Sequence, residues 1–317
     1  MDTARYQESA LPFHLNQCTL CPRRCGVDRV AGRTGFCRST ATMRVARAAL
    51  HMWEEPCISG TEGSGTVFFT GCSLRCRFCQ NAEISGSHSL PGIDVTPSRL
   101  AEIFLKLQSE GANNINLVTA GHHIIPCAES LRTAKERGLT IPVVYNSSGY
   151  ELPEALRLLD GLVDVYLPDF KFMDPDLALQ YCSAADYPDI AKSALEEMLR
   201  QMEKGGTKGA LFDARGIMTH GVIVRQLLLP GHVSDAKKII EYLYHTYRDR
   251  IWISMMSQYT PMSAVEKDPL LGRRVTKREY DRLVDYALSL GVANAFIQER
   301  KAAADSFIPS FHGEGVL

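Results

Sequence analysis

From residue 65 onwards the chain alternates between two hydrophobic patterns. Short apolar runs rich in β-branched residues are followed by longer segments in which apolar residues recur every three or four positions. These patterns are typical of buried strands and of amphipathic helices. We predict strands at residues 66–71, 114–120, 141–147, 163–170, 222–229 and 251–256. We predict helices at residues 97–110, 128–137, 152–159, 189–203, 234–247 and 277–290, the last opening with a capping box from Thr276 to Glu279.

Strands that alternate with helices predict a parallel sheet. Six such units favour an α/β fold of the partial (β/α)6-type TIM-barrel kind over a two-layer sandwich. The composition changes only near the amino end, where cysteine and arginine accumulate. We therefore predict a Cys-rich N-terminal module at residues 1–62, a barrel at residues 63–300 and a C-terminal tail at residues 301–317.

Bulk charge and hydropathy narrow the classes of partner. The 317 residues include 35 Lys and Arg against 36 Asp and Glu, for a formal net charge of -1. This balance does not indicate a nucleic acid or an anionic membrane as partner. No apolar run approaches the roughly 20 residues that cross a bilayer, and the first residues do not resemble a signal peptide. We expect a cytoplasmic protein.

Ten cysteines are many for a reducing compartment, where clustered thiols indicate metal binding or catalysis rather than disulfides. Seven of them form two groups, Cys18, Cys21, Cys25 and Cys37 followed by Cys72, Cys76 and Cys79. The other three, Cys57, Cys127 and Cys182, have no partner at ligand spacing, and we expect them to be small apolar residues of the core.

The second group lies directly after the first predicted strand. Three thiols within eight residues can hold one face of a cubane cluster and leave the fourth iron open to an outside ligand. The alternatives are a zinc site with a distant fourth ligand, or three unliganded thiols. Because zinc sites usually use C-x2-C pairs, the spacing favours a [4Fe-4S] cluster.

Polar residues lie at or near the carboxyl end of every predicted strand, which is the face where parallel barrels carry their sites. After the cysteine loop these are residues 119–123, 146–150, Asp169 with Lys171, Arg225 and residues 257–260. An arginine within a buried strand needs an anionic partner. The sequence therefore predicts one site at this end of the barrel.

The motif Cys72-x3-Cys76-x-Phe78-Cys79 resembles the signature of the radical S-adenosylmethionine (SAM) superfamily. The segments Trp53-Glu54-Glu55-Pro56-Cys57 and Cys79-Gln80-Asn81-Ala82-Glu83 resemble the branch of pyruvate formate-lyase activating enzyme-like proteins. This resemblance extends from about Cys18 to about Glu299.

The resemblance implies that Cys72, Cys76 and Cys79 hold a [4Fe-4S] cluster whose open iron binds SAM. It implies reductive cleavage of SAM to a 5′-deoxyadenosyl radical that abstracts hydrogen from a substrate. The residues that it assigns to SAM are Phe78 near the adenine, Asn146 and Ser148 in the loop for the ribose, Asp169 and Lys171 in an Asp-x-Lys element for the carboxylate, and Arg225 as a SAM or substrate contact.

Two loops depart from the pattern of that branch. The family usually carries a Gly-Gly-Glu loop for the methionyl amine, whereas this chain has Gly121, His122 and His123 and no acid there. We expect Gly121 and His122 to contact SAM, and the alternative for the two histidines is a solvated loop. The loop at residues 257–261 lacks the histidine of a Pro-Tyr-His loop. This second departure weakens the link to glycyl radical enzymes.

The first cysteine group supplies four soft ligands, which suit either zinc or a second iron-sulfur cluster. We favour zinc slightly, because the segment is short and has little apolar core of its own. Between residues 18 and 50 there are seven arginines, Arg23, Arg24, Arg29, Arg33, Arg38, Arg44 and Arg47, against one acid, Asp28. A zinc-ribbon binding module with an inert barrel is therefore the alternative from another functional class.

The leading hypothesis is a radical SAM enzyme, and its most specific version activates a glycyl radical enzyme, a protein substrate. The second version modifies a metabolite or a peptide. The resemblance implies a low-potential electron donor such as flavodoxin or ferredoxin.

Overall fold

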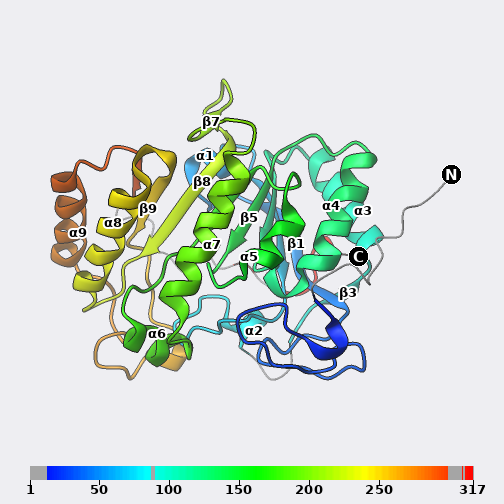
Figure 1. Ribbon diagram of the computed structural model, residues 1–317, viewed down its shortest axis with the longest axis horizontal. Helices are drawn as coiled ribbons and strands as arrows, with labels where there is room; N and C mark the ends of the chain where they lie inside the picture. The colour runs from blue at the N-terminus through cyan, green and yellow to red at the C-terminus, as the bar shows by residue number, and fades with distance from the viewer. Residues whose placement is uncertain (1–12, 87–89, 299–308, 310, 317) are drawn as a thin grey trace.

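The computed structural model describes residues 13–86, 90–298, 309 and 311–316 of the chain, and these form a curved sheet covered by helices (Figure 1). The strand order is β10-β9-β8-β6-β5-β4-β2-β1-β3, with β7 paired to β8. The strands are β1 (Met43–His51), β2 (Ser64–Phe69), β3 (Ile93–Val95), β4 (Ile115–Val118), β5 (Val143–Ser147), β6 (Val165–Pro168), β7 (Leu211–Phe212), β8 (Met218–Leu227), β9 (Trp252–Met256) and β10 (Ala295–Ile297). Among the described residues β3 and β10 end the sheet, so the barrel is open.

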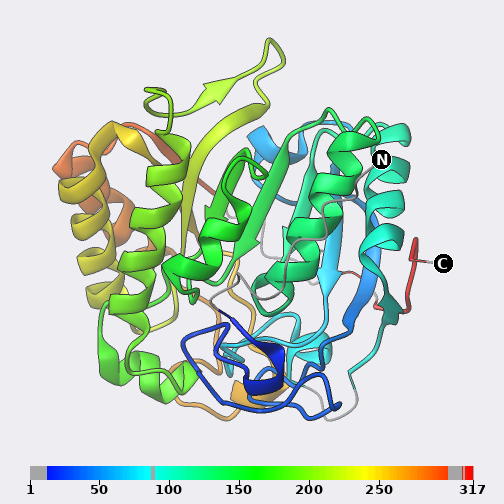
Figure 2. The ribbon, with the colours of Figure 1, turned by 45° about the vertical axis from the view of Figure 1, so that its right-hand side comes forward.

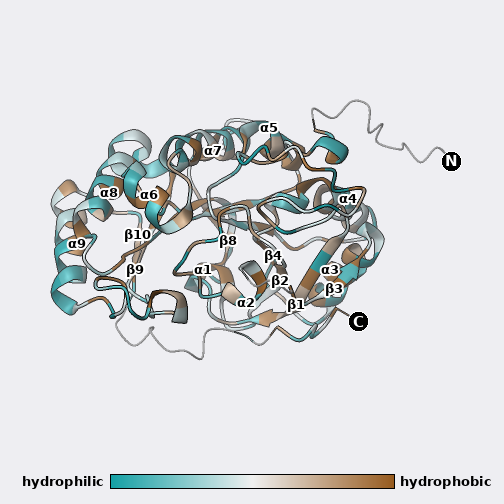
Figure 3. Cartoon of the chain, turned by 90° about the horizontal axis from the view of Figure 1, so that it is seen from below, coloured by the Kyte–Doolittle hydropathy of each residue, from teal (hydrophilic) through white to brown (hydrophobic). Residues whose placement is uncertain are grey.

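The longer helices lie around the outside of the sheet, as the view from below in Figure 3 shows. The helices are α1 (Pro56–Ser59), α2 (Ala82–Ser85), α3 (Pro97–Ser109), α4 (Ile124–Glu136), α5 (Pro153–Leu156), α6 (Pro175–Cys182), α7 (Tyr187–Met202), α8 (Val233–Tyr247) and α9 (Lys277–Leu290). Strands β2, β4, β5 and β6 are buried along their whole length. This burial is expected of a parallel sheet whose two faces are both covered.

The predicted α/β partial barrel is confirmed. The six predicted strands correspond to β2, β4, β5, β6, β8 and β9, which pair in parallel in that order. The predicted capping box of α9 is also present, with Thr276 Oγ1 accepting from Glu279 N at 3.3 Å and Glu279 Oε2 accepting from Thr276 N at 2.9 Å. Each predicted helix begins or ends within a few residues of an observed one.

The sequence prediction omitted β1, β3, β7 and β10. β1 pairs antiparallel with β2, and β3 pairs antiparallel with β1. Residues 43–51, which the prediction assigned to the Cys-rich module, thus extend the barrel sheet. The apolar residues of β1 do not alternate cleanly with its arginines, so the pattern gave no strand signal. The three-domain division stays a prediction, and residues 301–308, 310 and 317 of its tail lie outside the described residues.

The first described segment, residues 13–42, contains no helix of more than one turn. It lies at the same end of the sheet as α2 in both ribbon views (Figures 1 and 2). Arg29 of this segment donates to the carbonyl of His122, just beyond the carboxyl end of β4, at 2.8 Å. The N-terminal cysteines are therefore on the face where the polar strand ends meet.

None of the helices in the described part of the chain has the length and apolar character needed to cross a bilayer.

Candidate active site

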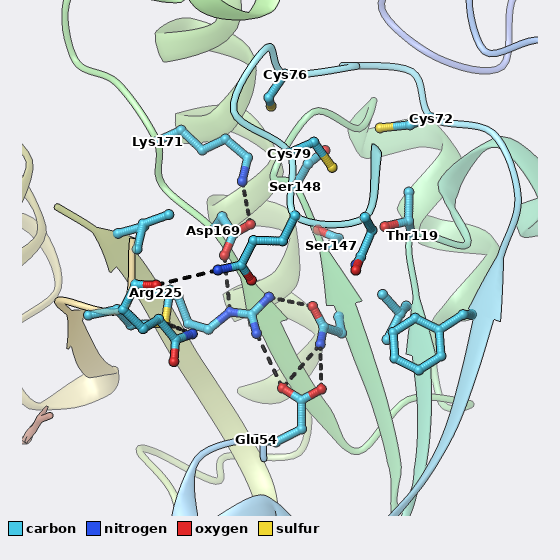
Figure 4. A pocket seen from close by; sticks show the side chains of 18 of the residues that line it. Glu54, Cys72, Cys76, Cys79, Thr119, Ser147, Ser148, Asp169, Lys171 and Arg225 are labelled. Carbon is cyan, nitrogen blue, oxygen red and sulfur yellow. Dashed lines mark hydrogen bonds and ion pairs between the residues drawn. The ribbon is translucent and has the colours of Figure 1, made fainter. Parts of the chain in front are cut away.

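A cavity opens at the carboxyl ends of the strands, and side chains from distant parts of the chain line it (Figure 4). Most of the predicted site residues are among the lining residues: Cys72, Cys76, Phe78, Cys79, Asn146, Ser148, Asp169, Lys171 and Arg225. Trp53 and Glu54 also line it, from the segment between β1 and α1. The fold thus places the three-cysteine loop and the polar ends of β5, β6 and β8 around one space.

The cysteine loop begins at Gly71, whose φ of 89° lies in the left-handed region. A Cβ at this position would lie 2.5 Å from the backbone oxygen of Cys37, so glycine is required. The loop then curls around Cys72, whose Sγ accepts from the N–H groups of Leu74 at 3.3 Å and Arg75 at 3.4 Å. These donors favour a thiolate at Cys72.

Burial raises the pKa of Cys72 to about 12 in the metal-free chain. Burial likewise raises the pKa of Cys79, whereas Ser85, which donates to Cys79 Sγ at 3.3 Å, and Lys171 lower it. Metal ligation requires thiolates, so a cation must replace the protons. The three sulfurs line one cavity, and each accepts a hydrogen bond, Cys76 from Cys182. The chemistry of these donors fits an iron-sulfur cluster, although no three side chains of the described residues are already grouped as metal ligands.

The charged groups at the ends of β6 and β8 form a continuous chain of ion pairs. Lys171 Nζ lies 2.5 Å from Asp169 Oδ2, and Asp169 Oδ1 lies 3.0 Å from Arg225 Nε. The same guanidinium lies 3.3 Å from Glu54 Oε2 and donates to Asn146 Oδ1. Each of the two cations therefore has an acidic partner, as a buried cation requires.

Burial by itself would raise the pKa of Asp169, but Arg225 and Lys171 lower it below its ordinary value. Burial would likewise lower the pKa of Lys171, but Asp169 and Cys76 raise it. Glu54 differs, because burial raises its pKa even though Arg225 and Asn116 lower it. At neutral pH the cavity therefore carries fixed, opposite charges at Lys171 and Asp169.

The sequence interpretation gave Glu54 no role beyond the family resemblance. Its carboxylate accepts from Asn116 at 3.0 Å and from Asn146 at 3.3 Å in addition to Arg225. Two adjacent acids before a proline, in a segment flanked by apolar residues, were the available signal. Glu54 reaches the strand ends only because the segment after β1 turns into the barrel.

The loop after β5 is fixed to the loop after β6. Gly149 has a φ of 75°, and a Cβ there would lie 2.5 Å from the backbone oxygen of Asp169. The hydroxyl of Tyr187 donates to the carbonyls of Ser148 at 2.9 Å and Asp169 at 3.0 Å, and accepts from Lys171 N at 2.9 Å. Tyr187, on α7, therefore holds together the two loops that carry the predicted SAM residues.

The comparisons with known proteins agree with this arrangement. The sequence model of the radical SAM superfamily matches residues 66–210. A curated but uncharacterised protein of Methanocaldococcus jannaschii is 31% identical over 276 residues, which are 85% of this chain and 74% of that protein. The chain belongs to the radical SAM superfamily.

Solved structures of radical SAM proteins resemble the chain at low sequence identity. SuiB of Streptococcus suis bound to S-adenosylmethionine is 10% identical, with a TM-score of 0.45 over 73% of this chain and 49% of SuiB. Methylornithine synthase is 12% identical, with a TM-score of 0.47 over 71% of this chain and 67% of that enzyme. A domain of pyruvate-formate lyase-activating enzyme from Bacteroides vulgatus is 14% identical, with a TM-score of 0.39 over 56% of this chain and 92% of the domain. This radical SAM chain spans about half of the length of SuiB.

Gly121 and His122, which we expected to contact SAM, are not among the lining residues of this cavity. Both histidines of the loop are buried, so the loop is not solvated. His122 Nε2 donates to the carbonyl of Thr70 at 2.7 Å, and burial lowers its pKa to about 4. In this radical SAM chain His122 thus braces the strand that leads to Cys72, and its contact with SAM stays a prediction.

An acid does lie beside Gly121, although the loop itself has none. A Cβ on Gly121 would lie 3.1 Å from Glu151 Oε1, and Glu151 Oε2 accepts from Ser147 Oγ at 3.1 Å. Burial raises the pKa of Glu151 to about 7. An acid one turn beyond a predicted strand end was the sequence signal for it. Glu151 therefore orients Ser147, which lines the cavity.

Phe78 lines the cavity and also belongs to an aromatic cluster. Its ring packs edge-to-face against Phe172 at 6.0 Å and Tyr181 at 6.4 Å between centroids. The prediction that Phe78 serves both core packing and ligand contact is compatible with this position.

The four N-terminal thiols influence one another electrostatically, but no three His, Cys, Asp or Glu side chains of the described chain are grouped closely enough to hold a metal ion. Burial raises the pKa of Cys21 to about 12, and the charges of Cys37, Cys18 and Cys25 raise it further. A Cβ at Gly35 would lie 2.3 Å from Cys25 Sγ. The glycine therefore leaves room for the Cys25 sulfur beside the turn that precedes Cys37. Four soft donors in one short segment fit a tetrahedral metal.

Arginines of the N-terminal segment bind the radical SAM core rather than pointing away from it. Arg23 donates to the carbonyls of Ser73 at 2.8 Å and Cys182 at 2.9 Å. Arg38 donates to the carbonyl of Gly86 at 2.7 Å. Further internal partners are Thr40 for Arg29, Asp28 for Arg33, Asp94 for Arg44 and Glu314 for Arg47. These contacts leave few arginines for a phosphate backbone.

Proposed function

We propose that this radical SAM enzyme binds a [4Fe-4S] cluster through Cys72, Cys76 and Cys79 and cleaves SAM reductively to abstract hydrogen from a substrate. The observation that supports it is the single cavity shared by the three thiols and the polar ends of β5, β6 and β8. When bound, a reduced cluster supplies the electron that splits SAM into methionine and a 5′-deoxyadenosyl radical.

The residues of the cavity would hold SAM in place for that step. Lys171, whose pKa is raised, presents a permanent positive charge to a carboxylate. Asn146 and Ser148 offer polar groups to ribose hydroxyls, and Phe78 offers an aromatic face to adenine. Arg225 already has Glu54 and Asp169 as partners. In this proposal Arg225 orients Asn146 and Asp169 toward SAM, and its own contact with SAM or substrate stays a prediction.

We propose a second metal site on Cys18, Cys21, Cys25 and Cys37, with zinc favoured over a second cluster. The spacing of the four cysteines and the short length of the segment support it. Metal analysis of protein prepared with both iron and zinc distinguishes the two. One zinc per chain, retained in a Cys76→Ala variant and lost in Cys21→Ser, is the expected result.

For the substrate we propose a glycyl radical enzyme as partner, with flavodoxin or ferredoxin as the electron donor. The resemblance to activating enzymes supports this version, and the altered loop at residues 257–261 argues against it. Reduced enzyme with SAM and a candidate partner should yield 5′-deoxyadenosine and a glycyl radical signal. If 5′-deoxyadenosine forms without that signal on any candidate, modification of a metabolite or peptide replaces the glycyl radical version of the proposal.

We also propose that the protein acts in the cytoplasm, because the cysteines of the described chain are free thiols.

Anaerobic reconstitution with iron and sulfide tests the core proposal. Wild-type protein should develop [4Fe-4S] absorbance and form 5′-deoxyadenosine from SAM and dithionite, whereas Cys76→Ala should do neither. Cys127→Ala is the matched control, because this thiol is buried within α4 and has no place in the cavity. Wild-type protein without a cluster would leave the zinc-ribbon alternative, which the internal contacts of the arginines disfavour.

A further inference from the structure

Cys76, one of the three proposed cluster ligands, has another cysteine as its neighbour. Its Sγ lies 3.2 Å from the Sγ of Cys182, which is the last residue of α6. The sulfurs of a disulfide lie about 2.05 Å apart, so a closing movement of about 1 Å would join these two. The fold therefore gives Cys76 a partner outside the proposed ligand set.

Backbone contacts hold the two cysteines side by side. The N–H of Arg77 donates to the carbonyl of Tyr181 at 2.9 Å. Arg77 directly follows Cys76 and Tyr181 directly precedes Cys182, so this bond joins the two chain segments beside the thiols. Arg23 also donates to the carbonyl of Cys182 at 2.9 Å. The sulfur contact is thus fixed by the paths of the two segments and not by one side-chain rotamer.

The two thiols differ in their access to the cavity. Cys76 lines the candidate active site and is partly exposed, in a loop between β2 and α2. Cys182 is 1% exposed and is not among the lining residues. Oxidants attack exposed thiolates first, and a cysteine that binds metal is a thiolate. An oxidant that enters the cavity therefore reacts with Cys76, while Cys182 stays reduced behind it.

We propose that Cys182 is a resolving thiol, which captures Cys76 as a disulfide when a peroxide oxidises it. The proposal rests on the proposed function, because it treats Cys76 as a cluster ligand. Hydrogen peroxide first converts the Cys76 thiolate to a sulfenic acid, as an S–O bond forms, the O–O bond breaks and hydroxide leaves. The Cys182 thiol then attacks this sulfur, so that the S–S bond forms, the S–O bond breaks and water leaves. The two sulfurs lose the two electrons that the peroxide gains.

The disulfide has two consequences for the cysteine loop. It occupies one of the three proposed ligands, so the chain cannot take up a cluster until a thiol reductant reopens the bond. It also protects Cys76, because a sulfenic acid that meets no thiol is oxidised further to a sulfinic acid, which thiols do not reduce. Cys182 thus makes the oxidation of the loop reversible.

Peptide mass spectrometry of the full-length chain without cluster tests the proposal. The chain is treated with hydrogen peroxide, its free thiols are alkylated, and it is digested with trypsin without reduction. Trypsin separates the cysteines, because Cys76 lies in the dipeptide 76–77, Cys72 in residues 48–75, Cys79 in residues 78–99 and Cys182 in residues 172–192. We expect the dipeptide linked to residues 172–192 in the wild type, and the dipeptide with a sulfinic acid in Cys182→Ala.

Uptake of iron and sulfide is the second measurement. After peroxide and then dithiothreitol, the wild type should regain this uptake, whereas Cys182→Ala should not. Cys127→Ala is the matched control, since this thiol is equally buried but contacts Met43, and it should behave as the wild type does. If Cys182→Ala does not fold, the linked peptide of the wild type carries the test alone.

The outcomes separate this proposal from the proposed function. A peroxide-treated wild type in which Cys76 is unlinked, or is linked to Cys72 or Cys79, overturns the role of Cys182. Equal sulfinic acid in the wild type and Cys182→Ala overturns it as well. A wild type that takes up no iron and sulfide before any oxidation contradicts the proposed cluster instead, because the peptide measurement does not depend on that uptake.

Discussion

Cys182 Sγ lies 3.2 Å from Cys76 Sγ, although the two residues are 106 positions apart. Cys182 is the last residue of α6 and is almost completely buried. Its S–H group donates to the sulfur of Cys76, one of the three proposed cluster ligands. Hydrogen bonds to ligand sulfur are one of the means by which proteins set the potential of an iron-sulfur cluster.

Cys182→Ala should lower the midpoint potential of the reconstituted cluster. A hydrogen bond to the ligand sulfur stabilises the reduced cluster, which carries the more negative charge, so its removal makes reduction harder. A hydrogen bond of about 1 kcal/mol corresponds to about 40 mV for one electron. A redox titration followed by electron paramagnetic resonance measures the shift. Cys127→Ala, which removes an equally buried thiol that contacts Met43 instead, should leave the potential unchanged. Equal potentials in both variants would show that the Cys182 thiol does not act on the cluster.

Arg225→Met should reduce the free energy of unfolding of the metal-free protein by about 3–5 kcal/mol, because Glu54 and Asp169 lose their shared buried cation. Urea denaturation measures the effect. Arg250→Met is the control, since Arg250 pairs with Glu203 at a partly exposed site and should contribute about 1 kcal/mol or less. A similar loss of unfolding free energy in both variants would mean that the buried ion pairs of Arg225 stabilise the fold no more than the partly exposed pair of Arg250.

Glu151→Gln should stabilise the metal-free protein increasingly as the pH rises. The pKa of Glu151 is raised from 4.5 to about 7 by burial. The folded wild type therefore holds a proton that the unfolded chain has released between these values, and its stability falls through this window. The difference between variant and wild type should grow by on the order of 3 kcal/mol from below pH 4.5 to above pH 7.

Denaturation at several pH values measures this difference. Asp169, Lys171 and Tyr145 lie near Glu151 and are unchanged in the variant. Glu154→Gln, an exposed substitution in the first turn of α5, is the matched control. A constant difference across the range would exclude Glu151 as the titrating group.

Arg23→Met should loosen the cysteine loop, because Arg23 holds the carbonyls of Ser73 and Cys182. Hydrogen exchange of the amides between residues 72 and 79 should become about tenfold faster, the equivalent of roughly 1.4 kcal/mol of lost local stability. Arg33→Met, at an exposed position, should leave these amides unchanged. Unchanged hydrogen exchange in Arg23→Met would show that Arg23 of the N-terminal segment does not stabilise the cysteine loop.

The sequence was sufficient for features that depend on local spacing. The alternation of apolar runs with helical periodicity predicted β2, β4, β5, β6, β8 and β9, and the pair Thr276 and Glu279 predicted the start of α9. The motif from Cys72 to Cys79 was sufficient to predict the family, because its spacing lies within one loop and needs no distant residue. These features are encoded within a few residues, where chemistry and backbone geometry act directly.

Only the tertiary structure decided which distant residues act together. Cys182 was interpreted as an ordinary core thiol, yet the end of α6 brings it to Cys76. Glu54 and Arg225, 171 residues apart, form one buried ion pair because the segment after β1 turns into the barrel. Of the N-terminal arginines, which the sequence left open to nucleic acid, Arg23, Arg29 and Arg38 donate to backbone carbonyls of the barrel instead. Spacing along the chain determines the ligands of a local motif, whereas burial of polar groups forces long-range pairs that no local pattern records.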